Sequence, residues 1–375
     1  MELVFIGFSI FYLTTLSWYL IGFKKLPKSF PQTSTFIPSV SVIIAARNEQ
    51  KDILRCLQSL LTPENQKIIN EIIVVDDFST DSTFELVIQM AKLHPMIKGI
   101  QTKSFPEFSD VKSPKKRAIL CGLSVASGKW IALTDADCIV SSSWGMVFTD
   151  AISESSQMIA GPVEFITDQS LFSTWQHLEF AGLMLVAAGS VGQKKPSTIN
   201  GANLWIKKEA FNSVGGFEGI SHLISGDDEL LMHKIHAKYP DGIQYLPTPE
   251  ALVLTRPQPN LSSFWNQRKR WASKGLHYQS GSYKVFLAFF WLAHFLFLLL
   301  PFFALLGLVS WFIPFFIFLI KFFADGLFLS ASNNFLTQKV NPFSVLWFGW
   351  IQIPYLVFTG LMGTFSRFEW KGVRY

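Results

Sequence analysis

The segment "IALTDADCIVSSSW", residues 131–144, places Asp135 and Asp137 directly after a run of apolar residues. A short apolar run bounded by turn-forming residues is typical of a strand buried on both faces of a mainly parallel sheet, and such sheets bind ligands beyond the carboxyl ends of their strands. The carboxylates of an Asp-x-Asp pair can converge on one side as the hard oxygen ligands that Mg²⁺ or Mn²⁺ prefers. The alternative is that the two aspartates only cap a helix that begins near Ser141.

The same strand belongs to a longer segment, residues 38–255, in which short β-branched runs alternate with helical ones. This alternation indicates an α/β domain with a mainly parallel sheet. The expected strands are residues 40–46, 71–77, 129–137 and 244–248, and the expected helices begin near Asp52, Asp81, Pro114 and Lys207.

Membrane segments are expected on both sides of this domain, because 49% of the 375 residues are hydrophobic and only 16% are charged. Residues 1–23 supply the run of about 20 apolar residues that a spanning helix needs. A signal peptide would carry positive charge before its apolar core, and the only charged side chain there is Glu2. The segment is therefore expected to be a retained anchor. The basic stretch at 24–28 that follows it predicts that the α/β domain lies on the cytoplasmic side of the inner membrane.

Three further membrane segments are expected within residues 283–366, at 285–308, 311–330 and 343–365. Three full crossings would leave the basic tail, residues 367–375, on the outer side, against the positive-inside rule. One of the three is therefore expected to be re-entrant or interfacial, and the sequence does not show which.

Acidic residues also end the second expected strand, where Asp76 and Asp77 could accept a hydrogen bond from a nucleobase N–H or a ribose hydroxyl. The alternative is that this stretch only begins and caps the next helix. Lys115 and Lys116 stand at the start of the helix expected from Pro114, where ammonium groups beside backbone N–H donors suit an anion such as diphosphate.

Two adjacent carboxylates, Asp227 and Asp228, stand at the start of another expected helix. A general base must be a carboxylate or a histidine placed at the acceptor hydroxyl, so both are candidates for that role. The alternative is again that they only cap the helix.

Residues 256–282 are expected to form an interfacial region around an amphipathic helix. Gln267, Arg270 and Trp271 are spaced i, i+3, i+4, so on that helix an amide, a guanidinium and an indole lie together and could line one wall of a site. The alternative, a basic anchor before the next membrane segment, accounts better for Lys269 than for these three.

Five short motifs, in order, make the chain recognisable: "VVDDFSTD", "KKRA", "DAD", "GDDELL" and "QRKRW". Together they resemble the inverting family-2 glycosyltransferases, which have the GT-A fold, over about residues 38–280. The ending "WKGVRY" is similar to that of membrane members that glycosylate lipids, such as ceramide glucosyltransferases. Polysaccharide synthases of the family also contain the Gln-x-x-Arg-Trp set.

The resemblance implies roles for the residues that match its motifs. Asp76 and Asp77 would bind the nucleoside, and Lys115 or Lys116 would face the diphosphate. Asp135 and Asp137 would bind the metal, with Asp137 as the direct ligand and Asp135 also at the donor. Asp228 would be the base, with Asp227 where glutamate is usual, and Gln267, Arg270 and Trp271 would lie beside the acceptor and diphosphate. The choice between the two lysines stays open, because Pro114 stands where the family usually has glycine.

These features predict a membrane-bound enzyme that moves a sugar from a nucleotide-diphosphate sugar, with a UDP-sugar as the expected donor, to a hydroxyl of a lipid or lipid-linked acceptor. A divalent cation, Mg²⁺ or Mn²⁺, is the expected cofactor. The apolar run 178–192 is too short to cross a membrane and either faces the acceptor or is a buried helix. A processive polysaccharide synthase and a non-catalytic nucleotide-sugar-binding subunit of an envelope assembly stay open as alternatives.

Other classes of protein fit less well. A dinucleotide-dependent oxidoreductase would carry GxGxxG after the first strand, where "AARNEQ" stands. The basic clusters do not interleave with aromatic residues as single-stranded nucleic-acid sites do, so no nucleic-acid partner is expected. A transporter would need ionisable groups inside its spans, and Lys321 and Asp325 are expected near helix ends where they can snorkel.

Overall fold

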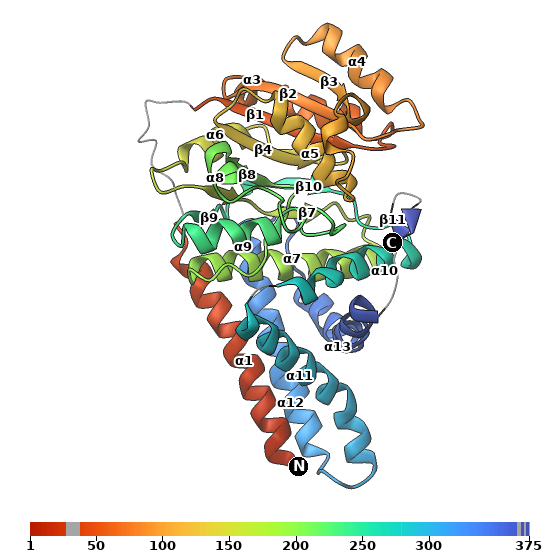
Figure 1. Cartoon of the computed structure of the whole chain (residues 1–375). Coiled ribbons are helices and arrows are strands. Elements are labelled where there is room, and N and C mark those ends of the chain that lie inside the picture. Colours follow the sequence, from red (N-terminus) through yellow and green to blue (C-terminus); the bar gives the residue numbers. More distant parts are fainter. Residues whose placement is uncertain (28–37, 279, 366–368, 371–372, 375) are drawn as a thin grey trace.

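The computed structural model describes residues 1–27, 38–278, 280–365, 369–370 and 373–374, so part of the expected basic tail lies outside the described residues. An α/β domain sits at one end of a bundle of long helices (Figure 1). The N-terminus lies at the far tip of the bundle, whereas the last described strands lie beside the α/β domain (Figure 1).

The strands are β1 (Val40–Ala46), β2 (Ile69–Asp76), β3 (Ile97–Gln101), β4 (Trp130–Asp135), β5 (Ile139–Val140), β6 (Met158–Ala160), β7 (Val163–Phe165), β8 (Leu204–Lys207), β9 (Ile243–Tyr245), β10 (Val253–Thr255), β11 (Glu369–Trp370) and β12 (Val373–Arg374). The helices are α1 (Glu2–Lys25), α2 (Ile53–Leu60), α3 (Pro63–Gln66), α4 (Thr83–Leu93), α5 (Pro114–Val125), α6 (Trp144–Asp150), α7 (Leu171–Gly192), α8 (Lys208–Ser213), α9 (Glu229–Lys238), α10 (Leu261–Ala272), α11 (Gly281–Leu305), α12 (Phe312–Ser330) and α13 (Pro342–Phe365), and the 3₁₀ helix η4 is Ser273–His277.

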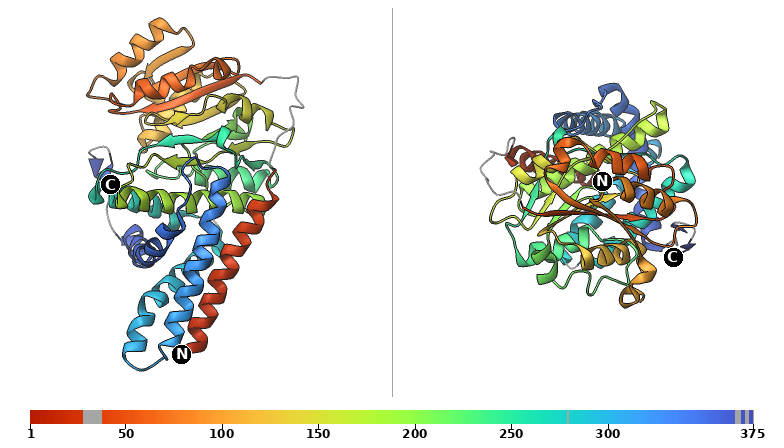
Figure 2. Two further views of the ribbon diagram at one scale, coloured as in Figure 1. Left: turned by 180° about the vertical axis from the view of Figure 1, so that it is seen from behind. Right: turned by 90° about the horizontal axis from the view of Figure 1, so that it is seen from above.

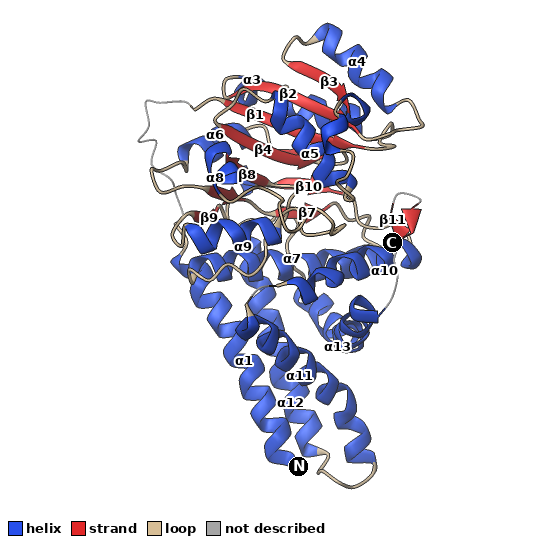
Figure 3. Cartoon of the chain, viewed as in Figure 1, coloured by secondary structure: helices blue, strands red, loops and turns tan. Residues whose placement is uncertain are grey.

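The main sheet has seven strands in the order β3-β2-β1-β4-β8-β6-β9 (Figure 3). The pairs β3–β2, β2–β1, β1–β4 and β6–β9 are parallel, whereas β8 runs antiparallel to both of its neighbours. Val42 and Ile44 of β1 pack on one face and Ile43 packs on the other, which is why this strand is continuously apolar. The predicted α/β class with a mainly parallel sheet is confirmed.

The predicted elements differ from the observed ones mainly at their ends. All four expected strands are present, but the last is shortened to β9, because the chain turns after Tyr245 with Thr248 donating to the Leu246 carbonyl. The expected interfacial helix is observed as α10 followed by η4. The run 178–192 lies within α7, most of whose residues are buried, as the buried-helix alternative expects.

Helices α1 and α7 pack backbone against backbone through glycines. A Cβ atom on Gly22 would lie 2.0 Å from the Gly189 carbonyl oxygen, and one on Gly192 would lie 1.9 Å from the Gly22 carbonyl oxygen. Lys25 and Trp18 of α1 also bond to the Gln193 side chain. The first helix of the bundle is therefore fixed directly to the α/β domain.

Among the residues that the structure describes, four helices, α1, α11, α12 and α13, are long and apolar enough to cross a membrane. Three of them, α1, α11 and α12, run side by side along the bundle, whereas α13 lies crosswise near the α/β domain (Figure 1, Figure 2). The different direction of α13 leaves β11 and β12 at the same end of the bundle as the α/β domain (Figure 1).

Charged residues inside the bundle are paired with each other. The Lys321 ammonium donates to Asp325 (2.5 Å) and Gln352 (3.0 Å), and the Tyr12 hydroxyl donates to Asp325 (2.5 Å). Both charged side chains are buried, so the expectation that they snorkel to a helix end was wrong. Buried charges are tolerated when they are paired and hydrogen-bonded, and this group joins α1, α12 and α13.

Replacing Gly22 with valine should lower the melting temperature of the detergent-solubilised chain, because the new side chain would collide with backbone atoms of α7. Overpacking of this kind costs about 1–3 kcal/mol or more. The control is Gly7→Val in the same helix, where a Cβ would meet no atom within 4 Å. Equal melting temperatures for the two variants would contradict the close α1–α7 contact.

Candidate active site

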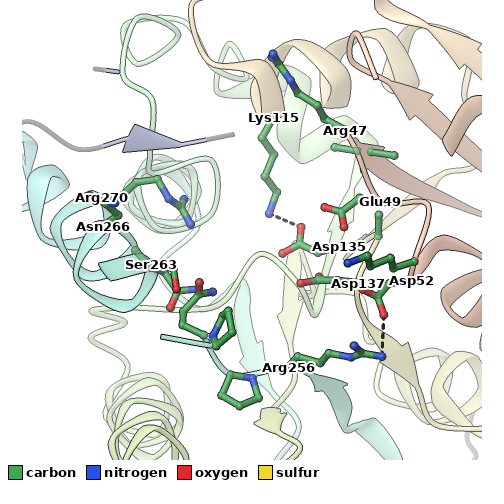
Figure 4. Close-up of a pocket in the computed structure, with 18 of the residues that line it drawn as sticks. Arg47, Glu49, Asp52, Lys115, Asp135, Asp137, Arg256, Ser263, Asn266 and Arg270 are labelled. Carbon is green, nitrogen blue, oxygen red and sulfur yellow. Dashed lines mark ion pairs between the residues drawn. The ribbon is translucent and has the colours of Figure 1, made fainter. Parts of the chain in front are cut away.

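A cavity of about 970 Å³ opens over the carboxyl ends of β1 and β4, between the α/β domain and α10 (Figure 4). Parallel strands direct ligands to this edge of a sheet, as the sequence predicted. The cavity is lined by charged side chains from separate segments, among them Arg47, Asp77, Lys115, Asp135, Asp137 and Arg270.

Asp135 is the last residue of β4, and Asp137 and Cys138 lie in the turn that follows it. Carboxylate oxygens of the two aspartates and the Cys138 sulfur all lie within 4.8 Å of one another. The next helix, α6, begins at Trp144 with Ser143 at its N-cap, so the aspartates do not cap it. Burial and the two carboxylates raise the pKa of the Cys138 thiol, which donates to Asp137. Two convergent carboxylates fit a hard divalent cation.

Lys115 points toward the aspartates from the start of α5 (Figure 4). Its ammonium lies 2.7 Å from Asp135 and 3.3 Å from Asp227. Burial alone would lower the pKa of this ammonium, but the two carboxylates raise it, so Lys115 stays a cation at neutral pH. The Ser113 hydroxyl accepts from the Lys116 amide and Pro114 takes the first helical position, which explains why α5 begins beside the cavity.

Lys116 points away from the cavity. Its side chain is fully buried, and its ammonium donates to the backbone carbonyls of Ile220, Leu223 and Ser225. The structure therefore places Lys115, not Lys116, beside the aspartates, and it does not bear out the placement of Lys116 at the diphosphate.

Asp76 and Asp77 diverge, because successive side chains point to opposite sides of an extended chain. Asp77 lines the cavity and accepts two bonds from Nη2 of Arg117, at 2.7 and 2.9 Å, and one from Thr102 at 2.9 Å. Asp76 accepts from Gln101 (3.1 Å) and adjoins a separate cavity of about 220 Å³. The two aspartates that the sequence grouped together therefore face different surroundings.

Asp228 caps α9 and also belongs to the charged group beside the cavity. It accepts from the backbone N–H groups of Glu229 (2.6 Å) and Gly201 (3.0 Å), and the Lys274 ammonium lies 3.7 Å away. Burial would raise the pKa of Asp228, but Lys274 and Lys115 lower it, so this side chain is a carboxylate at neutral pH. The capping alternative is thus correct without excluding a chemical role.

Asp227 and Asp228 stand behind Lys115, next to the cavity rather than in its lining. Asp227 is buried, and its contact with the site is the ion pair to Lys115.

Gln267 and Arg270 of α10 line the cavity, but Trp271 does not. The Trp271 ring stacks on Phe180 of α7, with 5.9 Å between ring centroids. The expected trio is therefore divided between two tasks, since two side chains face the cavity and the third packs α10 onto α7.

Sequence reasoning missed several residues of the site. Arg117 forms the ion pair with Asp77, and Arg47 and Glu49 line the cavity just after β1. Arg256 lines the cavity on the side opposite Lys115, and its guanidinium pairs with Asp52 at 3.2 Å (Figure 4). The strand-end rule applied to β1 would have found Arg47 and Glu49, whereas nothing local in the sequence marks Arg256.

Family models match most of the chain. The model for glycosyl transferase family group 2 matches residues 130–364, and the model for glycosyl transferase family 2 matches residues 41–215. The chain belongs to glycosyltransferase family 2. Its fold is GT-A-like, a glycosyltransferase fold for which dependence on a divalent cation is typical.

Named relatives differ in what they make. The chain is 24% identical to the poly-β-1,6-N-acetyl-D-glucosamine synthase of Staphylococcus epidermidis over 263 residues, 68% of this chain and 57% of that protein. It is 23% identical to the β-monoglucosyldiacylglycerol synthase of a Nostoc species over 247 residues, 64% of this chain and 49% of that protein. The chain thus matches only about half of the length of these two relatives.

One solved structure resembles nearly the whole chain. The mannosyltransferase PcManGT of Pyrobaculum calidifontis, in complex with GDP-Man and Mn²⁺, superposes with a TM-score of 0.57 and 16% identity. The match covers 96% of this chain and 93% of that one. This likeness shows the fold.

Replacing Asp137 with asparagine should weaken Mn²⁺ binding, because it removes one of the two convergent carboxylates. The loss should be at least about tenfold, since even changes outside the ligand shell cost 10–100-fold. Binding is measured by electron paramagnetic resonance of free Mn²⁺ in a titration, with exposed Asp110→Asn as the control. Equal affinities for the two variants would contradict a metal site here.

Proposed function

We propose that the chain transfers a sugar, with inversion, from a nucleotide-diphosphate sugar to a hydroxyl of a lipid or lipid-linked acceptor at the cytoplasmic surface of the inner membrane. The observation that carries this proposal is that one cavity is lined both by the Asp135 and Asp137 carboxylates and by side chains of α10. Helix α10 packs on α13, one of the four long apolar helices. The carboxylates that would bind the donor's metal ion and a helix that would adjoin the membrane therefore line the same cavity.

Asp135 and Asp137 would hold a divalent cation. When bound, the cation would supply positive charge to the departing nucleoside diphosphate. Lys115 adds a fixed positive charge next to Asp135, at the positively polarised N-terminus of α5. We assign Asp77 to the nucleoside, with Arg117 holding its carboxylate in place.

We assign the general base to Asp228. Its lowered pKa keeps it ionised, and therefore able to accept a proton, throughout the neutral range. It would take the proton of the acceptor hydroxyl, whose oxygen attacks the anomeric carbon opposite the leaving diphosphate, and this in-line displacement inverts the anomeric centre. Gly201 and Glu229 fix the direction of the carboxylate through their backbone N–H groups.

The arrangement of the helices supports a lipid acceptor. With α1, α11 and α12 crossing the bilayer and α13 crosswise, the α/β domain and the C-terminal strands share one side of the membrane. Lys24 and Lys25 end α1 on that side, which the positive-inside rule makes cytoplasmic. The name of the Nostoc relative, a glycolipid synthase, agrees with such an acceptor.

A processive polysaccharide synthase is the second candidate, because the Staphylococcus relative is named as one and has similar identity. The two candidates differ in product length. One sugar on a lipid supports the single-transfer proposal, whereas a ladder of sugars on one acceptor supports the synthase.

The test is transfer by purified, detergent-solubilised chain, given a panel of UDP- and GDP-sugars, Mn²⁺ and a host lipid extract, and followed by mass spectrometry of the lipids. We expect a lipid heavier by one sugar, absent with chelator or with Asp137→Ala and retained with Asp110→Ala. Donor binding without any new lipid product would contradict the lipid acceptor, and failure to bind any donor would contradict the donor assignment.

Asp228→Asn should lower kcat while donor affinity is kept, because asparagine preserves the shape of the side chain but cannot accept the proton. The loss should be about 10²–10⁴-fold, the usual contribution of a general base. Transfer rates and donor affinity are measured side by side for Asp228→Asn and Asp227→Asn. Near-normal transfer by Asp228→Asn would show that the base is another residue.

A further inference from the structure

A buried lysine that does not enter the cavity contacts the segment that leads to the two carboxylates. We propose that Lys116 is a positioning residue, which holds residues 218–226 so that Asp227 and Asp228 stay fixed behind the cavity. This inference rests on the proposed role of those carboxylates. It assigns Lys116 a task different from that of its neighbour Lys115.

The contacts of Lys116 are all with one segment. Its ammonium lies 2.7 Å from the Ile220 carbonyl, 2.8 Å from that of Leu223 and 3.0 Å from that of Ser225. An ammonium has three N–H donors and no acceptor, so all three donors are used on these carbonyls. The Ser113 hydroxyl, at the start of the same helix, donates to the intervening Ile224 carbonyl at 3.2 Å.

The segment joins α8 to α9 without forming a helix or strand, and its own backbone bonds are those of single turns, such as Ile220 to Phe217 and Leu223 to Ile220. It ends at Gly226, whose φ of +84° is a conformation that residues with a Cβ rarely adopt. Asp227 follows this turn directly, so the position of the carboxylates depends on how firmly the preceding carbonyls are held. Lys116 supplies three of those attachments from the helix that also presents Lys115.

Charged groups of both signs face Lys116. Asp227 and Asp228 favour its ammonium form. Lys274 of η4 is a cation that disfavours this form, and Lys116 in turn disfavours protonation of His277, also of η4. Burial is the largest effect, and it lowers the pKa of Lys116 to about 8. Lys115 differs, because its carboxylate partners raise its pKa.

Loss of one proton changes the attachment without removing it. A neutral amine keeps two N–H donors for three carbonyls, and its lone pair repels the third. The segment should therefore loosen as the pH rises through about 8. Misplacement of a reacting group by about 1 Å can cost on the order of 100-fold in rate, so activity should fall with it.

Global stability should behave differently from activity. The pKa of Lys116 is about 8 in the folded chain, below the ordinary value of 10.5 expected for the unfolded chain. Between these values the unfolded chain binds more protons, so this lysine makes stability rise, not fall, with pH. An alkaline loss of activity caused by Lys116 should therefore occur without a matching fall in melting temperature.

The first experiment compares the dependence of kcat on pH in the full-length, detergent-solubilised wild type, Lys116→Arg and Lys116→Met. We expect an alkaline fall centred near pH 8 in the wild type and none in Lys116→Arg, because guanidinium stays charged. Lys116→Met should be slower by about 100-fold at neutral pH with donor affinity kept. The control is Lys238→Met, since exposed Lys238 also donates to one carbonyl, that of Ser213. A wild-type alkaline fall that persists in Lys116→Arg would overturn the proposal.

The second experiment needs no substrate and no variant. Hydrogen exchange of residues 218–226, read by mass spectrometry and corrected for the intrinsic effect of pH, should show loss of protection between about pH 7 and about pH 9, while the strands of the sheet stay protected. Unchanged protection would overturn the proposal even if Lys116→Arg failed to fold. Because this experiment uses no substrate, its result does not depend on whether the chain transfers a sugar. Failure of the Lys116 proposal can therefore be distinguished from failure of the sugar-transfer proposal.

Discussion

The ammonium of Lys115 is the contact on which the candidate site depends. It lies between Asp135, at the end of a central strand, and Asp227, in the segment before α9, so it joins two parts of the chain that no sheet pairing connects. Asp227 is buried and Asp135 is partly exposed, and without a cation between them the two carboxylates would repel each other. Arg117, two residues further along α5, does the same for Asp77. The first turn of one helix therefore pairs with acids from three segments.

A second buried ion pair connects this site to the long apolar helices. Arg268 of α10 donates to Glu179 of α7, and the Tyr355 hydroxyl of α13 donates to the same carboxylate at 2.7 Å. Breaking such a pair from one side leaves a buried charge without its partner, at a cost of about 3–5 kcal/mol. Gln267 and Arg270, on either side of Arg268, owe their direction into the cavity to this attachment. The position of α10 along the cavity therefore depends on its contacts with α7 and α13 as well as on its own sequence.

The sequence predicted what local pattern controls and missed what side-chain direction and long-range packing control. Continuous apolar runs identified the buried strands, and acids at strand ends located the cavity. The alternation of side chains along the predicted strand already implies that Asp76 and Asp77 point apart. Nothing local could show that Lys116 turns into the protein while Lys115 faces the cavity, because these two are adjacent residues of like chemistry at one helix start. The direction of α13 was equally hidden, since its composition matches that of its neighbours and its course depends on contacts such as Lys321 with Gln352.

The α/β domain and the helices are joined at more than one place, which restricts how an acceptor can approach. Glu164 of β7 accepts from the backbone N–H groups of Thr337 and Gln338, between α12 and α13, and so fixes that connection to the domain. With α1 fixed to α7 by glycine contacts as well, the domain cannot turn on the bundle without exposing or breaking buried polar groups. If the acceptor is a lipid, as proposed, the surface where α10 meets α13 is the part of the cavity wall that adjoins a long apolar helix, and the lipid hydroxyl would approach from there. A rigid approach of this kind places the reacting hydroxyl by the depth at which the lipid sits, so membrane position itself becomes part of substrate selection.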